Sequence, residues 1–356
     1  MIKKIAITLF SLTLAIVGFF LWFVSLLGSE IDTNYRDAVA SDLAYLASPV
    51  DENRGKVLAI VTSTGVMGAE NKATGFELTE LARAFHVFQV NGFEVDIASP
   101  LGGEAPMVLD EDDMGPYDYA FLNEQSNIKK IQNTLRVDQV DSAEYDAVYF
   151  VGGKGTMFDF PDNPFIQQIV KDFSVQDKVI AAVCHGPAAL VNVTTDNGNW
   201  FIENRKVAGF SNDEELFLIP TANTLFPFLL ESRLVSRGAQ YVEGERYLNH
   251  VVVDGNLVTG QNPWSVWQLA EKTIIQLGYQ PVPRPITAEE HSIAVLGSYA
   301  EFGYDTALQE LHDVLVNSGS DISRSTLAVH AFVALIEWDL KKSLDLLRLL
   351  SSIEDD

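Results

Sequence analysis

The stretch KVIAAVCHGPAALVNV, residues 178–193, decides the fold and contains the only cysteine of the 356-residue chain, Cys184. Its apolar run, residues 179–183, is typical of a buried strand, and His185-Gly186-Pro187 predicts a tight turn into a helix. Such a turn holds a side chain out at the carboxyl edge of a sheet, where the start of a helix favours the thiolate form of a cysteine. A lone cysteine after an apolar strand is more often a small buried hydrophobe, so other segments must decide its role.

The amino-acid composition and the length of the chain limit which classes of protein it can belong to. The net charge of −25 argues against nucleic-acid binding, which needs clustered lysine and arginine. A single cysteine forms no internal disulfide, so cysteine usage does not reveal the redox compartment. The length suits one large domain with an appendage, or two domains.

The N-terminal segment reads as a membrane anchor. Residues 5–27 carry no charge, follow Lys3 and Lys4, and are long enough to span a bilayer. We favour an uncleaved transmembrane helix over a signal peptide, because no small-x-small cleavage site stands near Gly28. Glu30 and Asp32 follow. The positive-inside rule then predicts a single-pass protein with a cytoplasmic N-terminus and its body on the non-cytoplasmic side, the periplasmic face of the inner membrane in a bacterium.

The main body alternates strands and helices. Apolar runs at 56–63, 93–99, 145–151 and 179–183 predict strands, and the segments between them include helical patterns at 76–91 and 163–173. Continuous apolar strands indicate a mainly parallel sheet covered on both faces, which places ligands at the carboxyl ends of strands. Gly152-Gly153 and Cys184 both follow strands, so we expect them to share one crevice, with the glycines as candidate oxyanion donors.

No metal or cofactor is expected. The acidic run at 110–113 is typical of a solvated loop, because it lacks histidine and ligand spacing. The histidines outside the Cys-His pair also show no ligand spacing; they are His86, His250, His291, His312 and His330.

Five motifs in order resemble one family. They are TGFELTEL (74–81), NGFEVDIASPLGG (91–103), GGKGTMFDFPDN (152–163), AAVCHGPAAL (181–190) and LVTGQNPWS (257–265). On these stretches, the region 56–280 resembles the PfpI-type superfamily of class I glutamine amidotransferase-like proteins, within its glyoxalase III and stress-chaperone branch. The resemblance implies a flavodoxin-like three-layer α/β sandwich.

The resemblance also implies the catalytic residues. Cys184 would be the nucleophile, His185 its neighbouring histidine, and Glu80 the glutamate whose carboxyl hydrogen-bonds the sulfur. The third member of the triad falls on Glu215, and its neighbour Glu214 remains an alternative.

The same resemblance predicts how an oxyanion and the substrate are bound. Backbone N–H groups of Gly153 and His185 would form the oxyanion hole, and Gly152 and Lys154 complete the substrate-binding loop. The branch often has histidine where Lys154 stands, and His-Pro where Arg83-Ala84 stands. These departures affect the pocket, so the substrate is less well specified than the nucleophile.

The implied activity is that of a glutathione-independent glyoxalase, a hydro-lyase acting on methylglyoxal or related 2-oxoaldehydes. A thiolate adds to the aldehyde, amides hold the oxyanion, and a carboxyl moves a proton between the two carbons. Glu80 needs a raised pKa for this, which burial would supply. The alternatives are a cysteine peptidase or amidase, and a non-catalytic stress- or redox-sensing, chaperone-like protein.

Four segments are expected along the chain. They are an anchor at 1–29, a polar juxtamembrane connector at 30–54, the PfpI-like catalytic domain at 55–282 and a helical C-terminal module at 286–356. In the module, a loose 36-residue repeat relates Phe302 to Trp338, near the period of helical hairpins. Besides a small carbonyl substrate and the membrane, a homodimer and a protein partner for the C-terminal helices remain open.

Overall fold

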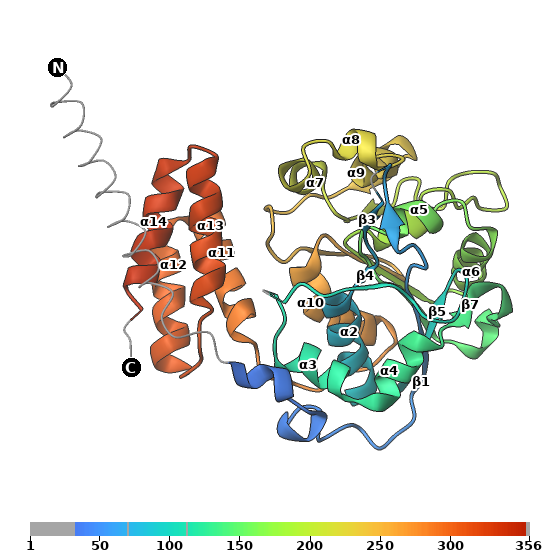
Figure 1. Ribbon diagram of the computed structural model, residues 1–356, viewed down its shortest axis with the longest axis horizontal. Coiled ribbons are helices and arrows are strands. Elements are labelled where there is room, and N and C mark those ends of the chain that lie inside the picture. The colour runs from blue at the N-terminus through green and yellow to red at the C-terminus, as the bar shows by residue number, and fades with distance from the viewer. Residues whose placement is uncertain (1–32, 70, 112, 354–356) are drawn as a thin grey trace. The chain divides into compact units, whose positions relative to one another are not determined.

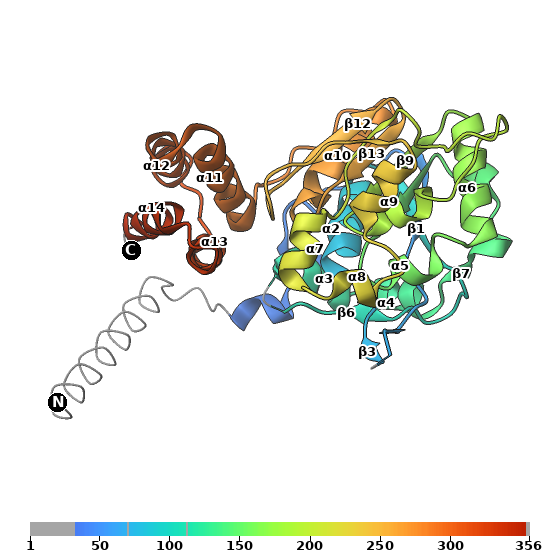
Figure 2. The same ribbon diagram turned by 90° about the horizontal axis from the view of Figure 1, so that it is seen from above.

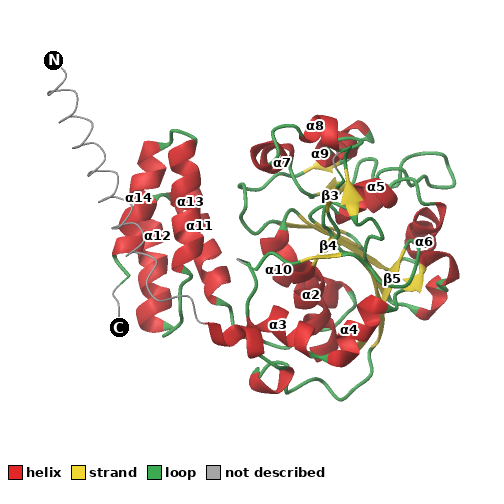
Figure 3. Ribbon diagram, viewed as in Figure 1, coloured by secondary structure: helices red, strands yellow, loops and turns green. Residues whose placement is uncertain are grey.

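The computed structural model describes residues 33–69, 71–111 and 113–353. The chain divides into a larger compact unit from Asn34 to Pro285 and a smaller one that includes the chain from Ile286 onward. The larger unit is an α/β sandwich, whereas the described part of the smaller unit is helical (Figures 1 and 3). The predicted anchor at 1–29 lies outside the described residues.

A seven-stranded sheet forms the centre of the larger unit in the described part of the chain. All neighbouring strands are parallel except one terminal pair, so the expected flavodoxin-like, mainly parallel sheet is confirmed. In spatial order the strands are β12 (Val251–Asp254), β13 (Leu257–Gly260), β9 (Val179–Val183), β8 (Ala147–Phe150), β1 (Gly55–Ile60), β5 (Phe93–Ser99) and β7 (Leu135–Arg136).

Helices cover both faces of this sheet, which explains why every residue of β8 and β9 is buried. α2 (Leu78–Val90) and α10 (Val266–Gln276) pack together on one face, and α6 (Pro164–Val175) covers the other (Figure 2). Further helices of this unit are α3 (Pro116–Asn123), α4 (Gln125–Gln132), α5 (Thr156–Asp159), α7 (Asn212–Leu218), α8 (Ala222–Leu225) and α9 (Leu230–Ser236).

α2 differs from the amphipathic helix that its sequence predicts. Nearly all of its residues are buried, because α3 and α10 pack on the sides that the sheet leaves open. Its charged residues are therefore buried too: Glu80 is 0% exposed and Arg83 4%. A carboxyl in the first turn of α2 thus sits in the protein interior, against the carboxyl ends of the strands.

Two segments are less regular than expected. The segment around Pro187, expected to be a helix, forms a short 3-10 helix, η5 (Gly186–Leu190), and the residues around 205–210 contribute only the two-residue strand β10 (Lys206–Val207). The predicted connector at 30–54 is more embedded than a polar linker: it forms the 3-10 turns η1 (Thr33–Asp37) and η2 (Ala40–Asp42), and Tyr45 joins the core.

The predicted membrane localisation requires correction. Across the described ranges, no helix combines the length and the apolar character needed to cross a bilayer, whose hydrocarbon core takes about 20 apolar residues. The predicted localisation, a single-pass membrane protein with its body on the non-cytoplasmic side, is therefore not supported by any described helix.

The smaller unit contains two helical hairpins, α11 (Ala288–Phe302) with α12 (Tyr304–His312), and α13 (Arg324–Ile336) with α14 (Leu340–Ser351). The 36-residue sequence repeat relates the two hairpins. Phe302 and Trp338 lie at equivalent bends and are 64% and 85% exposed, whereas Leu311 and Leu347 are both buried. The repeat therefore reflects one helical hairpin used twice.

Leu81→Ala should destabilise the larger unit, because Leu81 is completely buried in α2. The lost contacts and the resulting cavity should lower the free energy of unfolding by about 2–5 kcal/mol. Urea unfolding measures this loss. Leu101→Ala, at a side chain that is 74% exposed, is the control and should change stability by less than about 0.5 kcal/mol. Equal losses in the two variants would contradict the packing described here.

Candidate active site

Cys184 lies on a strained turn directly after β9. Its φ angle is +57°, a left-handed conformation that non-glycine residues adopt only when their surroundings enforce it. Two hydrogen bonds do so: the Cys184 N–H donates to the Gly260 carbonyl at 3.0 Å, and its carbonyl accepts from the Phe210 N–H at 2.8 Å. Separate segments of the chain therefore hold the cysteine at the carboxyl edge of the sheet.

Three elements converge on the cysteine at Gly152, which follows β8. A Cβ placed on Gly152 would stand 2.5 Å from Glu80 Oε2 and 2.8 Å from Cys184 Cβ, so no side chain fits there. The Gly152 N–H donates a 2.7 Å hydrogen bond to Glu80 Oε2. The glycine thus brings the carboxyl and the sulfur-bearing residue into contact with one turn of backbone.

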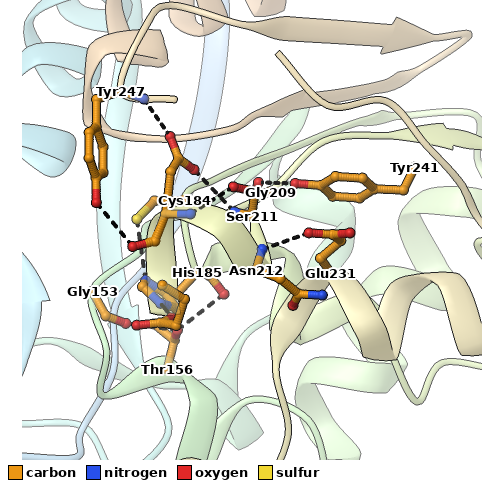
Figure 4. A network of polar contacts seen from close by, with 12 residues as sticks. Gly153, Thr156, Cys184, His185, Gly209, Ser211, Asn212, Glu231, Tyr241 and Tyr247 are labelled. Atoms are coloured by element: carbon orange, nitrogen blue, oxygen red, sulfur yellow. Dashed lines mark hydrogen bonds and ion pairs between the residues drawn. The ribbon is translucent and has the colours of Figure 1, made fainter. Parts of the chain in front are cut away.

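His185 links Cys184 to Glu215. Its Nδ1 lies 3.3 Å from Cys184 Sγ (Figure 4). Its Nε2 lies 2.5 Å from Glu215 Oε2. Because a carboxylate accepts the proton of Nε2, the lone pair of Nδ1 is left to face the thiol. The imidazole and the carboxylate are each 2% exposed. The geometry is that of a buried cysteine–histidine–glutamate triad.

Glu214 and Glu215 are neighbours in α7, yet they face different groups. Glu214 accepts hydrogen bonds from backbone and side-chain donors of the surrounding structure, namely Ser211 N, Tyr247 N, Gln261 Nε2 and Asn262 Nδ2. The Tyr247 hydroxyl also donates to the Glu214 backbone carbonyl. Glu214 therefore ties α7 to the sheet edge, and Glu215 is the carboxyl that reaches the histidine.

Glu80 is a buried acid beside the sulfur. Burial, and after it the neighbouring Glu77 carboxylate, raise the pKa of its carboxyl to about 8, against the opposing effects of the Cys184 thiol and the Gly152 N–H. Its Oε1 atom has no hydrogen-bond partner of acceptable geometry among the described residues. The Tyr149 hydroxyl fixes the start of α2 by donating to the Glu80 carbonyl at 2.8 Å.

The protonation state of the Cys184 thiol differs from the thiolate that the sequence predicts. Burial raises the pKa of Cys184 well above its usual range, and Glu80 and Glu77 raise it further, with Lys154 opposing them. The expected thiolate relied on the dipole of a following helix, but η5 is a five-residue 3-10 helix. A neutral thiol with an adjacent histidine base is therefore the form that the surroundings favour.

The N–H groups predicted to hold an oxyanion lie at the same edge of the sheet. Within the described residues, the N–H groups of Gly153 and His185 have no hydrogen-bond partner. The buried Thr156 hydroxyl lies 2.9 Å from the Gly153 carbonyl and 3.2 Å from the His185 carbonyl, so it braces both peptide units (Figure 4). Sequence reasoning missed Thr156, although it stands in the GGKGT motif itself.

Lys154 and Glu77 are each only partly exposed, and both act electrostatically on Cys184. Neither side chain makes a hydrogen bond or an ion pair of its own, as far as the described chain shows. Lys154 lowers the pKa of Glu77, Glu80 and Cys184 alike. Sequence reasoning missed Glu77, whose only signal was its place three residues before Glu80.

Arg83 stands at one of the positions where the sequence departs from the family pattern. Its side chain makes structural contacts with the segment around α3. It donates to the Asp113 carbonyl at 2.6 Å and pairs with Asp118, and both partners lie in or before α3. In the described ranges, no group of three or more potential ligands is placed to hold a metal ion.

Comparison with known proteins identifies the family. The DJ-1/PfpI family profile matches residues 72–210. Glyoxalase 3 of Candida albicans is 31% identical over 229 residues, which cover 61% of this chain and 96% of that protein. The chain belongs to the DJ-1/PfpI family. The resemblance seen in the sequence motifs is therefore confirmed.

Two further DJ-1/PfpI relatives support this assignment. The glutathione-independent glyoxalase HSP31 of Saccharomyces cerevisiae is 30% identical over 228 residues, covering 61% of this chain and 95% of that protein. The X-ray structure of Rapid Encystment Protein 24 kDa from Francisella tularensis superposes with a TM-score of 0.60 at 36% identity, over 63% of this chain and 99% of the other.

Glu80→Gln should stabilise the fold increasingly as the pH rises. The folded protein keeps a proton on Glu80 up to about pH 8, whereas the unfolded chain releases it near 4.5. The wild type therefore loses stability between these values, and glutamine removes this dependence. The stability gain should be roughly 2–3 kcal/mol larger at pH 7.5 than at pH 5.5. Urea unfolding at both pH values measures it; a pH-independent gain would contradict the buried, protonated carboxyl.

Glu214→Gln and Glu215→Gln should have separable effects. The first turns an amide N–H₂ toward buried donors and should cost about 1–3 kcal/mol of stability. The second lets an amide donate to Nε2, which places a proton on Nδ1 and removes the base beside the thiol. Glu215→Gln should therefore slow alkylation of Cys184 by iodoacetamide with little change in urea unfolding. The reverse pattern would exchange the roles of the two carboxyls.

Proposed function

We propose that this chain is a glutathione-independent glyoxalase that converts methylglyoxal or a related 2-oxoaldehyde into a 2-hydroxy acid through a covalent adduct on Cys184. One observation carries the proposal: the Cys184 thiol has a histidine base on one side and, across Gly152, a protonatable buried carboxyl. The N–H groups of Gly153 and His185 beside it have no partner among the described residues. The relatives from Candida albicans and Saccharomyces cerevisiae, both named as glyoxalases, support it.

The first step is addition of sulfur to the aldehyde. Nδ1 of His185 takes the thiol proton as Sγ attacks the aldehyde carbon, and Glu215 stabilises the imidazolium through Nε2. The oxygen that becomes negative is held by the N–H groups of Gly153 and His185. Proton return from His185 then gives a neutral hemithioacetal. Glutathione is unnecessary, because Cys184 itself supplies the thiol.

The second step moves a proton between adjacent carbons. The carboxylate form of Glu80 removes the proton from the former aldehyde carbon, and the resulting enediol takes a proton back on the neighbouring carbon. A general acid–base group works best with a pKa near the operating pH, which the value of about 8 provides. The product is a 2-hydroxyacyl thioester on Cys184, and water releases the 2-hydroxy acid and the thiol.

Cys184→Ser and Glu80→Gln should abolish lactate formation from methylglyoxal, followed with purified protein and no glutathione. Loss of the nucleophile removes the covalent route, and loss of the proton shuttle should cost about 10²–10⁴ in kcat. Glu144→Gln changes an exposed glutamate and should leave the rate unchanged. Added glutathione should not raise the wild-type rate.

Two results would overturn the proposal. Peptide or amide cleavage without aldehyde turnover would indicate the hydrolase alternative. Wild-type protein without either activity, together with ready oxidation of Cys184 to the sulfinic acid, would indicate a redox-sensing role.

A further inference from the structure

The two N–H groups proposed to hold the oxyanion come from separate segments of the chain. Gly153 belongs to the loop after β8, and His185 belongs to the turn after β9. Both N–H groups must point at one oxygen atom, so the distance between the two segments has to be fixed. The Thr156 hydroxyl links them, because it lies 2.9 Å from the Gly153 carbonyl oxygen and 3.2 Å from that of His185 (Figure 4).

Thr156 is the first residue of α5, and Asp159 is the last. A single helical turn is unfavourable to form by itself, so the position of α5 depends on the groups that its side chains bind. Thr156 binds the two oxyanion segments, as described above. Asp159 binds a different part of the sheet, the carboxyl end of β1.

The Asp159 carboxylate is held by uncharged donors of the segment that follows β1. Both of its oxygens lie 2.8 Å from Thr62 Oγ1, and the Ser63 N–H donates to Oδ2 at 2.7 Å. Thr62 is 0% exposed, and its hydroxyl oxygen also accepts from the Thr64 N–H at 2.9 Å. These hydrogen bonds attach α5 to the end of β1.

The same segment is packed directly against the oxyanion loop. A Cβ placed on Gly155 would stand 2.7 Å from Thr62 Cγ2 and 2.7 Å from the Thr64 carbonyl oxygen. Contacts this close transmit displacements, because a protein interior has little free volume. A change at the carboxylate that binds Thr62 would therefore reach the loop that carries Gly153.

Stability alone does not account for a carboxyl at this position. Burial raises the pKa of Asp159 to about 6, and the hydrogen bonds from Thr62, Ser63 and Thr64 only partly oppose this effect. Keeping the group ionised at neutral pH therefore costs folding free energy, which asparagine would avoid.

We propose that Asp159 is a positioning residue for the oxyanion N–H groups of Gly153 and His185, acting through α5 and Thr156. Its carboxylate holds α5 against the end of β1, and the Thr156 hydroxyl then fixes the two N–H groups relative to each other. The oxyanion exists only during the reaction, so this role affects kcat rather than KM. The inference rests on the proposed glyoxalase function.

Asp159→Asn in the full chain should lower kcat for lactate formation from methylglyoxal by about 10-fold, with KM changed less than about 2-fold. Thr156→Val should act in the same direction, and Thr156→Ser, which keeps the hydroxyl, should recover most of that loss. Because Asp159 is proposed to act through Thr156, the double variant Asp159→Asn/Thr156→Val should lose no more than the worse single variant. Asp162→Asn is the matched control: this exposed carboxyl binds the Asn192 side chain, and its loss should leave kcat unchanged.

The pH dependence distinguishes positioning by the carboxylate from a general loss of structure. Asp159 is ionised above about pH 6 and protonated below it, where it becomes neutral like asparagine. The ratio of the wild-type kcat to the Asp159→Asn kcat should therefore fall from about 10 at pH 7.5 to about 2 at pH 5. Ionisation of Glu80 and His185 is common to both proteins and cancels in this ratio.

The backbone amide NMR signals of Gly153 and His185 test the positioning without catalysis. They should move in Asp159→Asn and Thr156→Val, and stay in place in Asp162→Asn. Unmoved signals or wild-type kcat in Asp159→Asn, a kcat ratio that is constant with pH, or losses that multiply in the double variant would overturn the positioning role. Wild-type protein without lactate formation would overturn the proposed function, while the amide signals would still decide the positioning role.

Discussion

The hydrogen bond from the Gly152 N–H to the Glu80 carboxyl is the interaction on which the site depends. It joins the end of β8 to the first turn of α2, and the lack of a side chain at Gly152 lets Cys184 approach from β9. Burying a carboxyl this deeply costs free energy unless the group keeps its proton or accepts hydrogen bonds from nearby donors. The fold satisfies this constraint by giving it one backbone donor and a raised pKa, which is also what a proton shuttle requires.

At this edge of the sheet, the groups proposed to react are also buried. The sulfur, imidazole and two carboxyls are almost entirely shielded from water, so their mutual interactions are stronger than they would be at the surface. The N–H groups of Gly153 and His185 have no partner in the described part of the chain, and the carbonyls of the same two residues accept from the Thr156 hydroxyl. These two N–H groups are therefore available to donate hydrogen bonds to the oxygen of a reacting carbonyl.

Much of this arrangement could be predicted from the sequence. Apolar runs located the central strands, and the motifs around Cys184 and Glu80 identified residues that the fold brings together. Separating Glu214 from Glu215 needed coordinates, because adjacent residues of a helix point in different directions. Sequence reasoning missed the raised pKa of the Cys184 thiol for a related reason. That pKa depends on burial and on carboxyls at the start of α2, which is far from Cys184 in the sequence. Glu77 and Thr156 carried no signal beyond their proximity to recognised motifs.

The strained backbone at Cys184 has a consequence for the order in which heating disrupts the site and the sheet. Two hydrogen bonds, from segments near Gly260 and Phe210, hold a conformation that a cysteine would otherwise leave. Gly260 belongs to β13 of the seven-stranded sheet, whereas Phe210 lies outside that sheet. The Phe210 segment can therefore loosen while the central strands stay paired, and the turn at Cys184 would then relax and move the sulfur away from its histidine. On gradual warming, the geometry of the site should therefore be lost before the sheet unfolds.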